Sequence, residues 1–249
     1  MVILKTPLEI DAMKEAGCLS AKALRIVGEA VKPGVSTLEL DELAEEVIRQ
    51  EGGIPAFKGY GGFPATICAS VNDEVVHGIP SSKTILKAGD IISIDTGAIV
   101  DGWVGDNAQT FPVGKISPEK ARLLEVTEKS MWAGIGAARV NNHLGDIGFA
   151  IQSVAEAAGF SVVREYTGHG IGRDMHESPN VFNFGRKHAG LLLCEGMVLA
   201  IEPMVNMGKR KVRTMSDGWL VCTRDGKPSA HFERTVAITA EGPVVLTQE

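Results

Sequence analysis

Two aspartates, Asp95 and Asp106, lie on either side of an Asp101-Gly102 pair that separates two runs of β-forming residues. An Asp-Gly pair between such runs indicates a two-residue β-hairpin, because both positions tolerate a positive φ angle. This hairpin would place Asp95 opposite Ala108, with Asp106 on the same face of the sheet as Asp95. The Cα atoms of the two aspartates would then lie about 7–8 Å apart. Two carboxylates at that separation can hold a metal ion between them.

The sequence offers this acidic pair no neighbouring counter-charge. A solvated strand face is the simpler interpretation of two acids, but the other positions of the same face are apolar or small, and no Lys or Arg occurs between Lys87 and Lys115. Buried like charges without a counter-charge cost much free energy. A bound cation would compensate them, so we expect a metal site at the hairpin.

A glycine-rich segment contributes two histidines. His169 lies between Gly168 and Gly170, and His176 follows in the same stretch. Flanking glycines remove side-chain bulk, so the backbone and the imidazole can approach a ligand closely. The glycine spacing differs from G-x-G-x-x-G, which argues against a dinucleotide site. A single histidine is more often a packed core residue than a ligand, whereas two histidines in this stretch favour a functional role.

Two further acids stand in strand-like runs. Glu202 ends an apolar run, and Glu233 begins a β-rich run. Either acid could simply pair with a basic residue. Together with the two aspartates and His169, however, they make a set of four carboxylates and one imidazole, whose charge balances two divalent ions. This donor set suits Mn, Fe, Co, Ni or Zn better than a thiolate-type site would, and a metal pair would activate a water and polarise a carbonyl.

Helix and strand signals surround these residues. Thr6 supplies an N-cap, Pro7 the first helical position and Glu9 an acid three residues after the cap, which predicts a helix that continues towards Val31. The other predicted elements are helices over 37–52, from 117 and over 146–158, and strands over 66–70, 74–77 and 161–166.

The second half of the chain repeats a pattern of the first. The stretch 86–95, which ends at Asp95, matches the stretch 193–202, which ends at Glu202, in its leucine, glycine and apolar positions. This match indicates a duplicated helix-helix-strand unit, with halves of roughly 1–115 and 116–249. Since no Gly/Ser/Pro-rich linker separates the halves, we expect one α+β domain over 1–249 that brings the two acids together at its centre.

Composition excludes several classes of protein. The 249 residues are 44% hydrophobic and 22% charged, as in an ordinary globular protein, and the net charge of −6 argues against nucleic acid as the main partner. Four cysteines without a Cys-x-x-Cys pair indicate reduced thiols and a cytoplasmic location. The N-terminal apolar run is too short for a signal peptide, and no run approaches the length of a membrane span.

These motifs together resemble the methionine aminopeptidases, a branch of the pita-bread metallopeptidases. The resemblance covers nearly the whole chain. The segment 75–80, Val-Val-His-Gly-Ile-Pro, is similar to the methionine-specific branch, and Glu165 stands where proline-directed relatives usually have a histidine. The short spacings from His176 to Glu202 and on to Glu233 resemble the short bacterial type I form, because they leave no room for the insertion of type II enzymes. The segments that carry the resemblance are Asp95 with Asp106, Gly168-His169-Gly170-Ile171-Gly172, His176, Ile201-Glu202-Pro203-Met204 and Glu233.

The resemblance implies a curved, mainly antiparallel sheet with helices on its outer face, and a site for two divalent metal ions. It implies that Glu202 accepts a proton, His176 stabilises an oxyanion and His77 contacts the scissile amide. Phe57 and Met175 depart from the family pattern and leave the shape of the pocket open. The implied metal ligands are Asp95, Asp106, His169, Glu202 and Glu233, of which Asp106 and Glu233 bridge the metals, and the implied pocket residues are Tyr60, Phe63, Cys68 and Trp219.

The implied activity is removal of the N-terminal, initiator methionine from peptides and nascent proteins by attack of a metal-activated water. We expect a monomer without a membrane or nucleic-acid substrate, and a transient ribosome contact stays open. Two alternatives also stay open: an Xaa-Pro peptidase or creatinase-like hydrolase on the same scaffold, and a peptidase-like binding module without catalysis. The second is disfavoured because all five ligand positions hold metal-binding side chains.

Overall fold

The computed structural model describes residues 1–249, and its first two helices begin where the capping signals lie. Helix α1 (Pro7–Ala30) follows the N-cap Thr6, whose backbone N–H donates to the Glu9 carboxylate at 2.8 Å. Helix α2 (Thr37–Gln50) begins with the same capping box at Ser36. Helices α3 (Pro118–Ala137) and α4 (Leu144–Ala157) form the second pair, and α4 begins two residues before its predicted start.

A nine-stranded sheet runs through both halves of the chain, and all of its pairings are antiparallel. Its central path is β1-β4-β5-β14-β9-β7-β8, with β2 beside β4 and β15 beside β14. The two halves join where β5 pairs with β14, through Ala108 opposite Glu233. The strands are β1 (Ile54–Pro55), β2 (Ile67–Val71), β4 (Ile91–Val100), β5 (Trp103–Pro112), β7 (Gly168–Gly170), β8 (Glu177–Val181), β9 (Val198–Ile201), β14 (Glu233–Thr239) and β15 (Gly242–Val245).

The predicted β4–β5 hairpin is confirmed in loop length and register. Asp101 and Gly102 both adopt positive φ angles, 49° and 76°, as the type I′ turn requires. Asp95 lies opposite Ala108, and Asp106 lies opposite Gly97. The two acids therefore share one face of the sheet.

Two small sheets close one side of the molecule. One contains β13 (Ser229–His231), β10 (Met204–Asn206) and β6 (Ser161–Val162), and the other contains β11 (Val212–Thr214), β12 (Val221–Thr223) and β3 (Glu74–Val76). The strand predicted over 161–166 is wrong beyond Val162. β10 pairs with only Ser161 and Val162. One further bond, from the Val163 N–H to the Met204 carbonyl, extends the contact, and the chain is exposed by Glu165.

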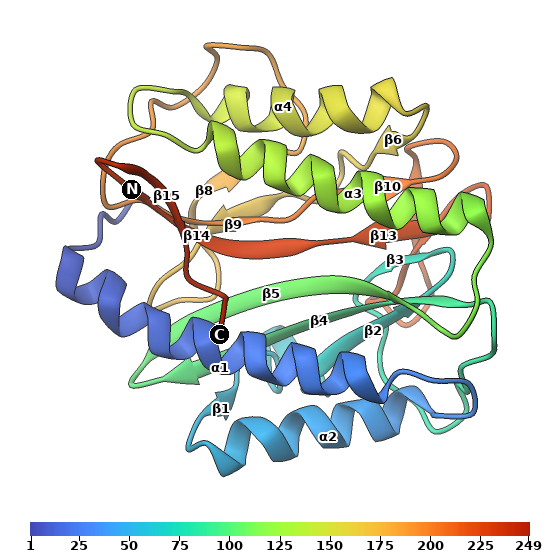
Figure 1. Ribbon diagram of the computed structural model, residues 1–249. Coiled ribbons are helices and arrows are strands. Elements are labelled where there is room, and N and C mark those ends of the chain that lie inside the picture. The colour runs from blue at the N-terminus through green and yellow to red at the C-terminus, as the bar shows by residue number, and fades with distance from the viewer.

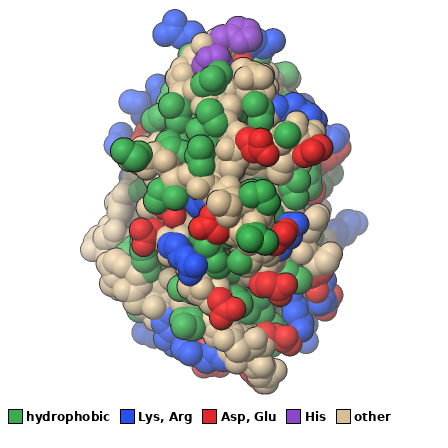
Figure 2. Space-filling model, turned by 90° about the vertical axis from the view of Figure 1, so that its left-hand side faces the viewer, with side chains coloured by type: hydrophobic (Ala, Val, Ile, Leu, Met, Phe, Trp, Pro, Cys, Tyr) green, Lys and Arg blue, Asp and Glu red, His purple; other side chains and the backbone are tan.

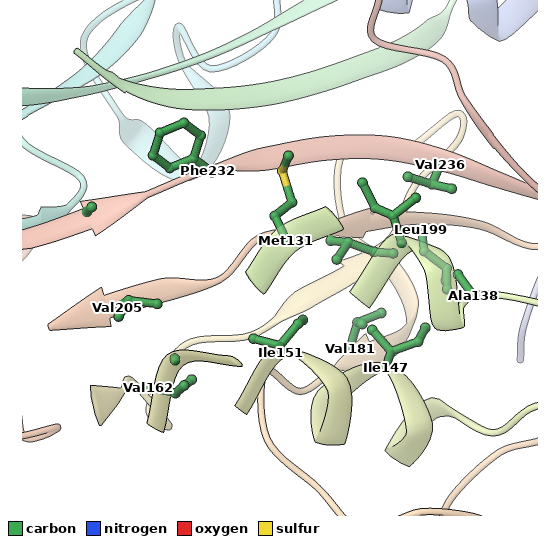
Figure 3. Close-up of a cluster of buried hydrophobic side chains, with 14 of the residues drawn as sticks. Met131, Ala138, Ile147, Ile151, Val162, Val181, Leu199, Val205, Phe232 and Val236 are labelled. Carbon is green, nitrogen blue, oxygen red and sulfur yellow. The ribbon is translucent and has the colours of Figure 1, made fainter. Parts of the chain in front are cut away.

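The helix pairs flank the sheet on its outer side. Figure 1 shows α3 and α4 above the sheet and α1 and α2 below it, so each half carries its own pair. In the second half, Met131, Ile147 and Ile151 of the helices pack against Leu199 and Val236 of the strands (Figure 3). Each such side chain gains about 1.5–3 kcal/mol by full burial. The predicted α+β architecture is confirmed, and the boundary near residue 115 stays a prediction.

A corresponding core lies in the first half. Leu24 of α1 and Leu40 of α2 pack against Ile92 and Ile94 of β4, and all four side chains are buried. None of the four helices has the length and apolar character that a bilayer span requires. With a core on the outer face of each half, the inner face of the shared sheet is left to carry polar side chains.

Candidate active site

The side chains that the sequence singled out converge on one cavity of about 330 Å³ on the inner face of the sheet. Asp95 and Asp106 enter it from the hairpin, and Asp106 is only 4% exposed. Because Asp95 and Glu233 both pair with Ala108, three adjacent strands aim acids at one place. The cavity is lined by Phe57, Tyr60, Gly61, Phe63, Cys68, His77, Asp95, Asp106, His169, Met175, His176, Glu202, Trp219 and Glu233.

The remaining predicted ligands complete a tight cluster. Nε2 of His169 lies 3.7 Å from Oδ2 of Asp106 and 3.6 Å from Oε1 of Glu202. One ligand atom from each of Asp106, His169 and Glu233 lies within 4.8 Å of the other two. The strand pairings impose this proximity, because His169 on β7 pairs with Ala200 just before Glu202, and β9 pairs in turn with β14.

Burial dominates the electrostatics of the four carboxylates. Desolvation raises the pKa of Asp106 to about 7, and it raises the pKa values of Asp95, Glu202 and Glu233 well above their ordinary range, with mutual repulsion adding to the effect. No cationic side chain binds them: the Arg234 guanidinium donates to the backbone carbonyl of Glu233 at 2.7 Å instead. The cluster therefore carries uncompensated negative charge whenever its acids ionise.

Several buried oxygen atoms in the cluster lack any hydrogen-bond partner: Oδ1 of Asp95, Oδ1 of Asp106 and Oε1 of Glu233. Buried polar atoms are normally paired, so these orphaned oxygens fit a role as ligands of a cation. The imidazole fits the same interpretation. Burial lowers the pKa of His169 to about 4, and its Nδ1–H donates to the Gly170 carbonyl at 2.9 Å, which leaves the Nε2 lone pair facing the acids.

Two more histidines stand at the edge of the cluster. The ring of His176 lies 4.3 Å from that of His169, and its Nδ1 is 2.8 Å from the hydroxyl of Tyr60. His77 adopts a positive φ angle of 60°, and its ring lies edge-on to Trp219 at 6.4 Å. Burial lowers the pKa values of both histidines, that of His77 to about 4. Both imidazoles are therefore neutral at pH 7 and can exchange hydrogen bonds with an amide.

His231 is a residue that the sequence did not single out. Its Nε2 lies 3.6 Å from Oε2 of Glu202, it is 1% exposed, and this atom has no hydrogen-bond partner. Burial lowers the pKa of its imidazole to about 3, so the ring is neutral. The sequence feature that could have identified His231 is its position two residues before Glu233, because alternate residues of an extended chain point to the same side. The β13–β14 break between the two residues made that signal weak.

An apolar wall closes the cavity beside the acids. Phe63 and Trp219 meet edge to face at 5.2 Å, and Cys68 is buried next to Phe63. The two positions that depart from the family pattern belong to this wall as well. A Cβ atom on Gly97 would lie 3.0 Å from Cε1 of Phe57 and 3.1 Å from Cε of Met175, so these side chains converge on a glycine of β4.

A curved antiparallel sheet that presents four buried or half-buried carboxylates and a neutral imidazole beside an apolar cavity defines a metal-dependent hydrolase. The family model of metallopeptidase family M24 matches residues 11–240, and the chain belongs to this family. It is 52% identical over 248 residues to methionine aminopeptidase 1 from Bacillus subtilis, with full coverage of both chains.

Solved structures agree with the family assignment. The crystal structure of methionine aminopeptidase from Thermotoga maritima superposes with a TM-score of 0.98 at 43% identity, covering 100% of both chains. An Xaa-Pro dipeptidase from Bacillus anthracis superposes with a TM-score of 0.78 at 22% identity, covering 99% of this chain and 62% of that one. The second likeness is one of fold alone. The pita-bread fold predicted from the sequence is confirmed.

Proposed function

We propose that this protein is a methionine aminopeptidase that removes the initiator methionine from nascent proteins and peptides. The observation that carries the proposal is a single cavity with two chemically different surfaces. Its floor consists of four carboxylates and an imidazole, and its wall consists of aromatic and sulfur-containing side chains. The floor suits a free α-amine and a scissile carbonyl, and the wall suits one unbranched apolar side chain. The names of the B. subtilis and T. maritima relatives support the same activity.

Asp95, Asp106, His169, Glu202 and Glu233 would hold two divalent ions. The orphaned oxygens and the neutral imidazole fit this role, and Mn, Fe, Co, Ni and Zn all suit the donor set. Bound ions supply Lewis acidity towards a carbonyl and lower the pKa of water. Which metal works in the cell depends on supply as much as on these side chains.

Glu202 acts as the proton acceptor. Its carboxylate lies between two neutral imidazoles, with Oε1 3.6 Å from His169 and Oε2 3.6 Å from His231. In the metal-free site, burial and the neighbouring aspartates raise the pKa of Glu202, and a carboxylate is one of the side chains that accept protons in general base catalysis. Glu202 therefore takes the proton that the attacking water loses and returns it to the departing amine.

His176 and His77 handle the peptide itself. The Tyr60 hydroxyl lies 2.8 Å from Nδ1 of His176. Donation from this hydroxyl to Nδ1 would leave the ring proton on Nε2, where it can stabilise the oxyanion of the tetrahedral intermediate. His77, held by its neighbours Tyr166 and Trp219, contacts the scissile amide. The methionine side chain of the substrate packs against the wall formed by Tyr60, Phe63, Cys68 and Trp219.

A direct test compares two peptides, Met-Ala-Ser and Ala-Pro, before and after treatment with a chelator. We expect methionine release from the first peptide, loss of that release in the chelator, recovery on adding back a divalent metal, and no cleavage of the second peptide. Preferential cleavage of Ala-Pro would favour the Xaa-Pro alternative instead. Absence of any hydrolysis with every metal tested would favour the binding-module alternative.

We further propose that the protein acts in the cytoplasm as a monomer on chains that emerge from the ribosome. Four free cysteines, of which Cys68 and Cys222 are buried, support a reducing compartment. Sedimentation velocity tests the monomer, and co-sedimentation with ribosomes tests the contact. A stable dimer would contradict the proposed monomer, and absence of the protein from the ribosome pellet would contradict the proposed ribosome contact.

A further inference from the structure

A second group of metal-ligating side chains lies outside the cavity, where α4 begins. His143 is the N-cap of α4, Asp146 lies in its first turn, and His188 belongs to the loop between β8 and β9. One ligand atom from each of these residues lies within 4.8 Å of the other two. None of the three lines the active-site cavity.

Backbone hydrogen bonds fix this group. The N–H of His143 donates to Oδ2 of Asp146 at 2.7 Å, and the N–H of His188 donates to Oδ1 at 2.9 Å. The Gly145 N–H also donates to the Ala189 carbonyl at 2.8 Å, which clamps the loop onto the start of the helix. The carboxylate is therefore held between the two histidines by their own backbone, whatever their rings do.

The two imidazoles approach this carboxylate without bonding to it. Nδ1 of His143 lies 3.7 Å from Oδ2, and Nδ1 of His188 lies 3.9 Å from Oδ1, both too long for hydrogen bonds. Nδ1 of His143 is buried and has no hydrogen-bond partner. Ligands of a tetrahedral ion with bonds of 2.0–2.1 Å lie about 3.4 Å apart. The three donor atoms, which lie within 4.8 Å of one another, are therefore near the separation that one shared ion requires.

The carboxylate of the group favours a cation, whereas the helix N-terminus and the nearby Lys187 oppose one. The backbone N–H of His188, followed by that of His143, lowers the pKa of Asp146, so its carboxylate is ionised at neutral pH. The nearby Lys187 ammonium lies over the ring of Phe149, 5.0 Å from its centre. Because a helix N-terminus favours anions, cation binding here would depend on the lone pairs and the carboxylate themselves.

The group is open to solvent on its His188 side, whereas the Asp146 side chain is only 11% exposed. The His188 side chain is 79% exposed, and Figure 2 shows histidine side chains gathered at the upper end of the molecule beside basic ones. Two imidazoles and one carboxylate with open positions for water are a donor set that late first-row transition ions prefer. Their affinity rises towards Ni²⁺ and Cu²⁺, and Zn²⁺ accepts the same ligands in a tetrahedral arrangement.

We propose that His143, Asp146 and His188 form a second transition-metal site, separate from the catalytic centre, which takes Zn²⁺, Ni²⁺ or Cu²⁺. A bound ion joins the loop before β9 to the start of α4. It therefore adds a cross-link between two segments that are otherwise held by backbone hydrogen bonds. Its ligands do not contact the peptide substrate, so its occupancy leaves methionine release unchanged.

The test counts Ni²⁺ ions bound by the metal-stripped full-length protein in equilibrium dialysis, with elemental analysis as the readout. His188→Asn removes the imidazole but tolerates the positive φ angle of 59° at this position, and His143→Ser keeps a helix N-cap. We expect each variant to bind one equivalent less than the wild type, and the neighbouring control Lys187→Ala to match the wild type.

Equal numbers of bound Ni²⁺ ions in the wild type and both histidine variants would overturn the proposal. As a second readout, Ni²⁺ should broaden the imidazole NMR signals of His143 and His188 in the wild type, and broadening of neither ring would also overturn it. Methionine release by His188→Asn, with the catalytic metal supplied, should equal that of the wild type. If His188→Asn loses both the bound ion and methionine release, the second site is not separate from the catalytic centre.

Discussion

Asp106 should make the metal-free protein less stable as the pH rises. Burial raises its pKa from the ordinary 3.8 to about 7, so the folded state holds a proton that the unfolded state loses above pH 3.8. At about 1.36 kcal/mol for each pKa unit, this difference corresponds to about 4 kcal/mol of destabilisation that develops between about pH 4 and pH 7. Below pH 4 the penalty disappears, because the side chain is protonated in both states.

The variant Asp106→Asn removes the ionisable group and should remove the penalty. In urea unfolding with a chelator present, we expect the variant to be more stable than the wild type by up to about 4 kcal/mol at pH 8, with a much smaller difference at pH 5. Its methionine release should be lost at both pH values. Asp101→Asn is the matched control, since this exposed residue of the same hairpin loses the same charge and should change stability by less than about 0.5 kcal/mol.

The reasoning fails if the metal-free wild type is equally stable at pH 5 and pH 8 and Asp106→Asn gives no gain at the higher pH. Such a result would mean that the carboxylate is charged and compensated within the protein itself. Saturating divalent metal should reverse the order of stabilities, because the wild type then gains binding free energy that the variant lacks. A wild type that gains nothing from metal would contradict the assignment of Asp106 as a ligand.

Three further substitutions test individual side chains. Glu202→Gln should keep the circular dichroism spectrum but lower kcat by about 10²–10⁴-fold, because the proton acceptor is gone, and near-normal turnover would refute that role. His176→Ala should lower kcat by about 10²–10³-fold and raise KM far less. The reverse pattern in steady-state kinetics would make His176 a residue that binds the substrate in the ground state. Lys5→Met should cost about 3–5 kcal/mol in urea unfolding, because it leaves the buried Glu177 carboxylate without its ion pair, whereas unchanged stability would show that the pair contributes nothing.

Local signals explain why much of the fold could be predicted. The capping boxes at Thr6 and Ser36 fix helix starts through bonds that span only three residues. The Asp101-Gly102 turn fixes the β4–β5 register, because a two-residue loop with positive φ angles permits only one pairing. The strand predicted over 161–166 failed beyond Val162, since a strand also needs a partner, and β10 supplies one for only two residues.

The sequence by itself determined the Asp95–Asp106 pair, because turn chemistry and the two-residue period of a strand act within one hairpin. It could also supply the chemical types of the distant donors and group them by their combined charge, but it could not show that they meet in space. Only the tertiary structure decided that β14 lies between β5 and β9, so that Glu233, Glu202 and His169 meet the hairpin. The position of His231 beside Glu202 and the approach of His188 to Asp146 were decided in the same way. Long-range pairing depends on how the whole apolar surface is buried, and no local pattern encodes that.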